Sequence, residues 1–497
     1  MEAETKNSES LRPSSHQGTI DTINPNLASD SVILVDWENE HDPQNPLNWP
    51  PARKWGIIST LSLMCFVTPL ASSMLAPGVP LILKDFQVNN NQLATFVVSV
   101  FVLGYATGPL LLAPMSELYG RTIVYHVCNI LFIIFTIACA VSQDMGMLIA
   151  FRFFAGFAGV AALTIGSGSI VDLMPQEQRG RAIALWSLGP LIGPVVGPVC
   201  AGFFVEEIGW RWVFWIIAIA YGVVTLVSFA VLRETYPPTL LKRKAARLRE
   251  ETGNPNYRSK LEGDGSPREI FVTAIIRPMK MLVALPPVTI MCCYIAIIYG
   301  ILYILFTTFT FVYVDIYGFN SRGAGLSFIA GGVGNILGLI FTGFLSDRII
   351  QNKQAKGLTP QPEDRLNLII TVPGALLLPL GLMMYGWTAE KHVHWIAPMI
   401  GTGLQGFGMM GLFMSVQAYL VDAYSAHAAS VTAANAVLRS ILGAILPLFG
   451  LEVYDSLGLG WGNTLLGLIL LGMAPVPWAF GKFGDRIRNN PKFQRPF

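Results

Sequence analysis

The chain has 497 residues, of which 53% are hydrophobic and 13% are charged, and its formal net charge is +2. Ordinary soluble domains carry about 25% charged residues, so this composition excludes a water-soluble globular protein. Lipid must solvate most of the surface.

The first 48 residues are polar and contain no cleavable signal peptide, which predicts a disordered cytosolic tail. Twelve apolar runs of about 20 residues follow, a length that fits membrane-spanning helices, whereas barrel strands are half as long. The sequence therefore predicts an all-α polytopic membrane protein. The runs begin near Trp55, Gln92, Ile123, Met145, Ala182, Trp212, Pro287, Gly323, Leu366, Trp395, Ser430 and Gly462.

A polar stretch between the sixth and seventh runs divides the membrane part into two sets of six helices. The predicted parts are a tail (1–48), a first half (49–232), a cytosolic linker (233–286), a second half (287–483) and a cytosolic tail (484–497). Residues 240–250 of the linker predict a basic amphipathic helix on anionic lipid, with a partner-binding helix as the alternative. Both termini are expected in the cytosol, because 27 of the 33 Lys and Arg residues then lie on the inner side.

The fifth run contains a glycine-proline pair at every fourth position. Glycines on one stripe let another helix approach closely, and prolines remove backbone donors and permit bending. The pattern predicts a moving interface between helices, with a static packing face as the alternative. The array comprises Gly189, Pro190, Gly193, Pro194, Gly197 and Pro198.

An internal repeat supports the division into halves. Ser116-Glu117 at the end of the second run matches Ser346-Asp347 at the end of the eighth, 230 residues later, and Asp172 matches Asp422 at an offset of 250. Many secondary transporters place a central site between two such repeats.

The loop after the second run reads Glu117-Leu118-Tyr119-Gly120-Arg121, and the fourth run opens Arg152-Phe153-Phe154-Ala155-Gly156. With the Gly-Pro array, these motifs resemble the major facilitator superfamily, specifically its fungal drug:proton antiporter group. The resemblance implies the major facilitator fold, with 12 transmembrane helices in two six-helix halves, and a role for Arg152 in proton transfer.

The loop motif has a physical rationale as a latch on the inner gate. Gly120 permits a tight turn, Arg121 can reach an acidic partner on a neighbouring helix end, and Glu117 can accept hydrogen bonds from a helix N-terminus. The alternative is an ordinary charged turn.

Two arginines lie inside apolar runs. Arg152 is about five residues from the outer end of its run, so a snorkelling side chain is the alternative to a buried functional one. Arg439 lies near the bilayer midplane, where an unpaired cation is costly, so we expect it to face a cavity or a polar partner. Asn435, four residues earlier, shares its face.

The middle of each run lacks Asp and Glu. The candidates for a proton carrier are therefore two carboxylates at inner helix ends, Asp172 and Asp422. The alternative is that they have a structural role. The residues expected to serve transport and gating are Glu117, Gly120, Arg121, Arg152, Asp172, the six residues of the Gly-Pro array, Asp347, Asp422 and Arg439.

Aromatic residues at helical spacing in the seventh run, together with amides on other runs, suit a bulky and partly apolar compound. Ordinary packing is the alternative for each of them. The predicted substrate-binding residues are Tyr299, Tyr303, Phe306, Asn335, Gln405, Gln417 and Asn435.

We therefore predict a plasma-membrane exporter of hydrophobic drugs, toxins or secondary metabolites, working by proton antiport and alternating access. The alternatives are uptake of a nutrient or polyamine, and a nontransporting membrane sensor. The expected partners are a small hydrophobic substrate, protons and membrane lipid, with no nucleic acid, and the protein is expected to be a monomer. No enzyme, cofactor or metal site is predicted, because the sequence has no metal-ligand cluster or nucleotide loop, and the proton gradient is the expected energy source.

Overall fold

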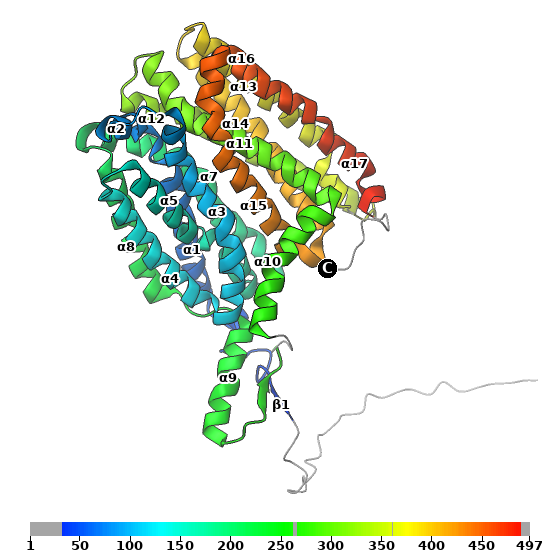
Figure 1. The fold of residues 1–497 in the computed structure, drawn as a ribbon. Helices are drawn as coiled ribbons and strands as arrows, with labels where there is room; N and C mark the ends of the chain where they lie inside the picture. The colour runs from blue at the N-terminus through cyan, green and yellow to red at the C-terminus, as the bar shows by residue number, and fades with distance from the viewer. Residues whose placement is uncertain (1–31, 262–265, 360, 489–497) are drawn as a thin grey trace, which may run out of the picture. The chain divides into compact units, whose positions relative to one another are not determined.

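The computed structural model describes residues 32–261, 266–359 and 361–488, which form two compact units. The smaller unit comprises the described residues up to Asp36 together with residues 241–261. The larger unit comprises the other described residues and holds all the candidate membrane spans (Figure 1).

Eleven segments of the described chain are long and apolar enough to cross a membrane, and their starts agree with those expected from the sequence to within four residues. The last segment, Ala428–Arg486, has 59 residues, or about 90 Å of continuous helix, which is far more than one crossing needs. Gly458 breaks it with a φ of 77°, in the left-handed region that favours glycine. This segment therefore supplies two crossings, and the fold has twelve.

The first half begins at Pro51 and ends at Val231. Its spans are α1 (Pro51–Ser73) continuing through η2 (Ala76–Gly78) and α2 (Val79–Asp85), then α3 (Asn91–Tyr119), α4 (Arg121–Ala140), α5 (Met145–Gly159) with α6 (Ala161–Leu173), α7 (Gln176–Ile208) and α8 (Arg211–Val231).

The second half begins at Pro286. Its elements are α11 (Pro286–Asp315), α12 (Ser321–Ala355), η3 (Pro362–Leu366), α13 (Leu368–Glu390), α14 (Ile396–Ala423), η4 (Ser425–His427), α15 (Ala428–Ile445), η5 (Leu446–Phe449), α16 (Gly450–Met473) and α17 (Pro475–Arg488). Because α17 continues to Arg488, helix extends past the boundary at residue 483 that the sequence predicted for the second half.

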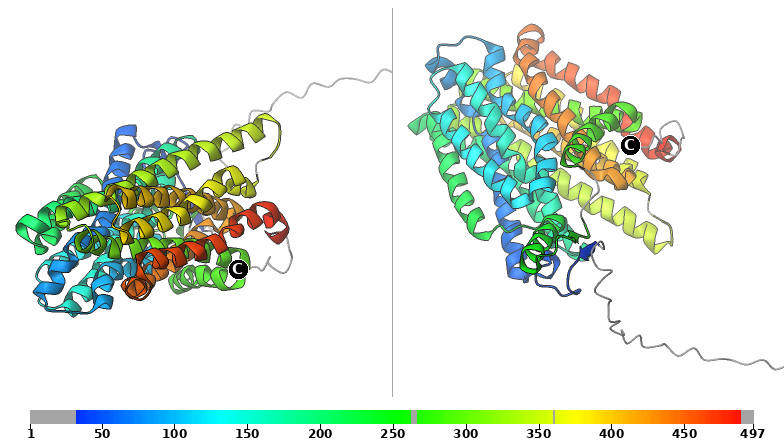
Figure 2. Two further views of the ribbon diagram at one scale, coloured as in Figure 1. Left: turned by 90° about the horizontal axis from the view of Figure 1, so that it is seen from above. Right: turned by 60° about the horizontal axis from the view of Figure 1, so that its bottom comes forward.

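Each half has its own apolar core. Leu61, Phe132 and Ile165 belong to the main cluster of the first half, and Ile295, Leu382 and Leu412 belong to that of the second. In the right view of Figure 2, the blue and cyan helices of the first half lie to the left of the orange and red helices of the second. Separate cores allow each half to move as a body.

The halves meet along two equivalent helix pairs. The helix α7 packs against α1 of its own half and against α12 of the other, and α15 packs against α11 of its own half and against α3 of the other. The fifth and eleventh spans therefore occupy corresponding positions, as the repeat predicts. Below, the linker face denotes the side on which α1 begins and α8 ends, and the opposite face denotes the other side.

The predicted linker contains more structure than the single amphipathic helix expected there. It holds α9 (Pro237–Thr252), β2 (Tyr257–Ser259) and α10 (Pro267–Ala284), and α10 packs against α3 and α15. In α9 the side chains of Leu241 and Ala245 are buried. These two apolar residues are covered by protein, and contact of the helix with anionic lipid stays a prediction.

The predicted N-terminal tail also contains secondary structure. Within it, β1 (Ile33–Val35) pairs in parallel with β2, and η1 (Pro46–Asn48) precedes α1. The Lys260 ammonium lies 2.5 Å from the Asp36 carboxylate beside this pair. Residues 1–31 and 489–497, which the sequence also assigned to the tails, lie outside the described residues.

Candidate functional site

A tight turn at Gly120 joins α3 to α4 on the linker face. Its φ is 97°, and a Cβ at this position would lie 2.4 Å from the Glu234 carboxylate. That carboxylate accepts hydrogen bonds from the backbone N–H groups of Arg121 (3.0 Å) and Thr122 (3.3 Å). Glu234 therefore caps the N-terminus of α4, where the helix dipole favours a negative charge.

The sequence had suggested Glu117 for this capping role. Glu117 is exposed, and Glu234, from the segment after α8, occupies the position instead. The cap therefore links the start of the third span to the end of the sixth.

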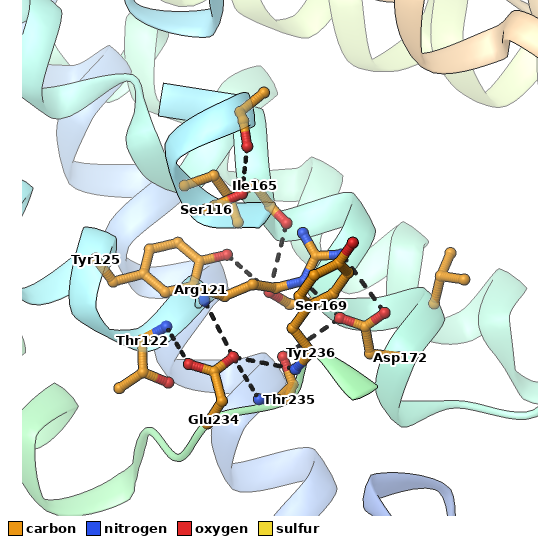
Figure 3. Close-up of polar contacts among 12 residues, drawn as sticks. Ser116, Arg121, Thr122, Tyr125, Ile165, Ser169, Asp172, Glu234, Thr235 and Tyr236 are labelled. Atoms are coloured by element: carbon orange, nitrogen blue, oxygen red, sulfur yellow. Dashed lines mark hydrogen bonds and ion pairs between the residues drawn. The ribbon is translucent and has the colours of Figure 1, made fainter. Parts of the chain in front are cut away.

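The Arg121 side chain forms an ion pair with Asp172 at the end of α6 (Figure 3). Its Nε lies 2.5 Å from Oδ2 of Asp172, and the two side chains are only 12% and 11% exposed. Thr235 donates a hydrogen bond to the same carboxylate oxygen (3.4 Å), and the Arg121 guanidinium lies 5.0 Å from the Tyr236 ring centroid. Burial raises the pKa of the Tyr236 phenol, so this ring is neutral.

The second half contains the equivalent pair. Arg365 in η3 donates from Nε to Asp422 at the end of α14 (2.9 Å) and from Nη1 to Ser346 in α12, the second span of this half (3.0 Å). Both halves thus join the start of their third span to the end of their fourth. The second pair is more exposed, at 25% for Arg365 and 40% for Asp422.

Sequence reasoning missed Arg365, although a signal existed. The repeat offset is 230 at Ser116 and 250 at Asp172, and Arg365 follows Arg121 by 244 positions, between these two values. Asp347, which the repeat did single out, is exposed and lies outside this contact.

The Gly-Pro array lies in a continuous helix, α7, despite its three internal prolines. Gly189, Gly193 and Gly197 are buried against α1, and an added Cβ at each would lie 2.7 Å from a backbone atom of that helix. The prolines lie on another side: Pro198 presents its carbonyl oxygen 2.4 Å from where a Cβ of Gly325 in α12 would stand. The array is therefore a close-packed seam between three helices, in agreement with the packing interpretation, whereas bending stays a prediction.

Polar contacts join the halves near the opposite face. Arg322 at the start of α12 lies 2.8 Å from Glu207 at the end of α7, and Asn320 donates to Glu206 (2.9 Å). Gln92 in α3 donates to Glu452 in α16 (2.8 Å). These contacts hold the opposite-face ends of the two halves together.

Arg152 is buried, with 1% of its surface exposed. Its Nη2 donates to the backbone carbonyls of Ser72 (3.0 Å) and Val98 (3.3 Å), and its guanidinium lies 5.1 Å from the Phe101 ring centroid. The side chain thus turns into the protein rather than snorkelling, and it links α5 to α1 and α3.

A partly open cavity lies between the halves beside α7, α11 and α12, with about 420 Å³ of space between atoms, part of which is open to solvent. Three of the predicted substrate-binding residues line it, namely Phe306, Asn335 and Gln405, together with Pro194 of the Gly-Pro array. The remaining lining is largely apolar, which is the chemical character expected for a site that binds a partly apolar compound.

The other predicted substrate-binding residues lie elsewhere. Tyr299 and Tyr303 precede Phe306 along α11. The ring centroids of Tyr303 and Phe306 are 5.5 Å apart, and those of the two tyrosines are 5.1 Å apart. Asn435 donates a 2.6 Å hydrogen bond to Gln417, so these two amides satisfy each other in part. The structure places them outside the lining of the cavity.

Arg439 in α15 lies over two aromatic rings, 5.2 Å from the Tyr299 centroid and 5.4 Å from that of Phe413. It is half-buried and, among the described residues, no carboxylate pairs with it. The sequence predicted that Arg439 faces a cavity or a polar partner. In the structure its guanidinium contacts the faces of two aromatic rings.

Residues 61–447 match the pattern of the Major Facilitator Superfamily, more than three quarters of the chain. The chain belongs to this superfamily. As a major facilitator it is a multi-pass membrane protein of a transporter family. The Arg121–Asp172 and Arg365–Asp422 ion pairs occupy equivalent places in the two halves of that fold, and a role as a latch on the inner gate stays a prediction.

Fungal proteins resemble this major facilitator closely. The chain is 50% identical over 461 residues to the efflux pump radE of Floropilus chiversii, covering 93% of this chain and 86% of that protein. It is 52% identical over 464 residues to the MFS-type transporter penM of Penicillium rubens, covering 93% and 91%.

Solved structures share the major facilitator fold at low identity. A bacterial homologue of the human lysosomal transporter Spinster, in an inward-facing conformation, superposes with a TM-score of 0.63 at 15% identity, covering 90% of this chain and all of that one. A D-xylose-proton symporter gives a TM-score of 0.65 at 15% identity, covering 86% and 97%. These likenesses support the fold.

Proposed function

We propose that this major facilitator exports hydrophobic drugs, toxins or secondary metabolites across the plasma membrane in exchange for protons. The observation that carries the proposal is its 50% identity, over nearly the whole chain, to a protein named as an efflux pump. The partly apolar cavity between the halves supports a substrate of this chemical class.

The linker face is the cytosolic face in this proposal, with both chain termini on that side. The excess of Lys and Arg in the linker and adjoining loops supports the assignment. The polar contacts near the opposite face then close the extracellular side, so that the cavity exchanges substrate with the cytosol in this state.

Alternating access follows if the halves rock about the seams of α7 and α15. Opening the extracellular side must break the contacts of Arg322 and Gln92. At the linker face, the Arg121 and Arg365 pairs each tie two spans within one half, which keeps the half rigid while it moves.

Proton coupling is assigned to Asp172. A carboxylate held by Arg121 is ionised, and a movement that withdraws the guanidinium leaves a largely buried carboxylate, for which protonation removes the cost of the unpaired charge. Asp422 is more exposed than Asp172, so its carboxylate can stay ionised at a smaller free-energy cost when Arg365 moves away.

The test uses purified protein in liposomes with an imposed pH gradient and a panel of dyes, azoles, polyamines and fungal metabolites. We expect gradient-driven movement of apolar compounds, and its loss in Asp172→Asn. Transport of a compound at the same rate with and without the pH gradient would contradict antiport. Accumulation of a polyamine or nutrient in the uptake direction would support uptake instead, and movement of no compound would support a nontransporting sensor.

The proposed partners are a small hydrophobic substrate, protons and membrane lipid, and the proposed functional state is a monomer. Size-exclusion chromatography with light scattering of the purified protein would check the last point. A dimer that persists on dilution would contradict it.

A further inference from the structure

Among the described residues Arg439 has no carboxylate partner, and it also lacks backbone acceptors such as those that hold Arg152, the buried arginine of α5. The Arg439 Nε is buried without a hydrogen-bond partner among the described residues. Arg121, Arg211, Arg322 and Arg365 each contact an Asp or Glu. A cation at membrane depth without a counter-ion is costly to retain, which makes it a functional candidate.

The aromatic rings around Arg439 offset only part of this cost. Cation–π contacts with the rings of Tyr299 and Phe413 stabilise the positive charge electrostatically. The rings accept no ordinary hydrogen bonds, so guanidinium N–H groups are left without acceptors. The site therefore supplies positive charge and hydrogen-bond donors in excess of what the protein itself uses.

Two further buried polar groups lie in this region: the Tyr105 hydroxyl, which interacts with Thr68, and the Asn435 side-chain oxygen, which has no hydrogen-bond partner among the described residues. The Tyr105 hydroxyl, from α3 of the first half, is close enough to Arg439 for an electrostatic interaction. The Asn435 side-chain oxygen belongs to the same face of α15 as Arg439, one turn away. A hydroxyl can donate to an anion, so both halves provide groups around the cation.

A line of aromatic rings connects this region to the cavity. Phe306 lines the cavity, its ring contacts Tyr303, Tyr303 contacts Tyr299, and Arg439 lies over Tyr299. Seven residues separate Phe306 from Tyr299, which is about 10 Å along a helix. The two places are therefore about one small-molecule length apart.

We propose that the exported substrate is an amphipathic organic anion, with a carboxylate-type group that binds Arg439 and an apolar body that lies in the cavity beside Phe306. The inference rests on the proposed function and specifies its substrate class. An anion supplies the missing counter-charge, and it accepts hydrogen bonds from the guanidinium and the Tyr105 hydroxyl.

The test uses matched probes, 7-hydroxycoumarin-3-carboxylate and its carboxamide, with the cationic dye rhodamine 123 as a third. Binding to the purified full-length protein is measured by titration, and efflux is measured in liposomes. Wild-type protein is expected to bind the carboxylate about 10-fold more tightly than the amide, the size of one charge-assisted hydrogen bond.

The variants are Arg439→Gln, Arg439→Lys and, as a control with the same loss of charge, Arg486→Gln at an exposed position of α17. Arg439→Gln should remove the preference for the carboxylate, Arg439→Lys should keep part of it, and Arg486→Gln should keep all of it. Thermal unfolding of each variant checks that the protein is folded.

Failure of this inference differs from failure of the proposed function. Efflux of the amide or of rhodamine 123 without measurable binding of the carboxylate overturns the anion site and leaves export standing. Absence of efflux for every probe, with the carboxylate preference intact in binding, overturns export and keeps the site. A carboxylate preference that survives Arg439→Gln also overturns the site.

Discussion

The two arginine–aspartate ion pairs differ in their exposure to solvent. Arg121 and Asp172 are about one tenth exposed, whereas Arg365 and Asp422 are 25% and 40% exposed. Exposed ion pairs contribute little to the free energy of unfolding, because water and salt screen them. Removing one partner of a buried pair costs more, because it leaves an uncompensated buried charge. The two halves are thus similar in geometry but unequal in electrostatic strength.

We predict unequal coupling energies in double-mutant cycles on the free energy of unfolding in detergent. The cycle with Arg121→Gln and Asp172→Asn should give about 1–3 kcal/mol, and the cycle with Arg365→Gln and Asp422→Asn about 0–1 kcal/mol. The second cycle is the matched control for the first. Equal coupling in the two halves would contradict the role assigned to burial.

Glu234 stabilises the turn at Gly120 by capping α4. Replacement Glu234→Ala should lower the free energy of unfolding by about 1–2 kcal/mol, because the backbone N–H groups of Arg121 and Thr122 lose their acceptor. The control Glu117→Ala, at an exposed position, should change it by less than about 0.5 kcal/mol. A larger effect at Glu117 would restore the assignment that the sequence suggested.

The sequence could not identify Glu234 as the cap. The carboxylate and the Arg121 amide are 113 positions apart, and no pattern among its neighbours marks Glu234. Arg121 was predictable, because its motif combines a glycine turn with a basic residue. Arg365 has no such motif before α13, and only the repeat offset indicates it.

At the scale of elements, the seam between α7 and α1 depends on the absence of side chains. Substituting Gly193→Ala places a methyl group 2.7 Å from the Phe66 carbonyl oxygen and 2.9 Å from the Leu70 amide nitrogen. Moving backbone atoms in two packed helices costs free energy. We therefore expect the free energy of unfolding to fall by about 1–3 kcal/mol and transport to be slower.

The control for this substitution is Gly222→Ala in α8, where an added Cβ meets no atom within 4 Å. That change should be neutral or stabilising by up to about 1 kcal/mol, since alanine favours helix more than glycine does. Thermal unfolding and efflux rates of both variants provide the measurement. If Gly193→Ala behaves like Gly222→Ala, the seam is looser than its geometry indicates.

The twelve spans were predictable because a long apolar run has few alternatives in a membrane. The pairing of β1 with β2 was not, since three-residue strands far apart in sequence carry no periodic signal. The helix α10 was also missed: its polar start, with a capping box at Ser266 and Glu269, resembles the rest of a charged linker. The cavity depends on side-chain packing between halves, so only some of its lining residues were foreseen.

For the molecule as a whole, alternating access requires the ends of α7 and α12 on the opposite face to separate. We predict that a short bifunctional thiol reagent applied to the double variant Glu206→Cys with Asn320→Cys stops transport, because these side chains are in contact across the two halves. Efflux from reconstituted vesicles, before and after treatment, is the measurement.

Each single-cysteine variant, treated in the same way, controls for modification without cross-linking. These variants should keep their transport, since one modified residue leaves the halves free to part. Continued transport by the fully cross-linked double variant would exclude separation at this face.

The pairing of β1 with β2 constrains the order in which the protein is made. The strand β1 precedes the first span and β2 follows the sixth, so the pair encloses the entire first half in one chain loop. During synthesis β1 must wait until Ser259 has emerged, and at that moment the second half does not yet exist. Formation of this small parallel pair therefore marks completion of the first six spans, and a ribosome-bound chain that ends shortly after the linker should already contain it.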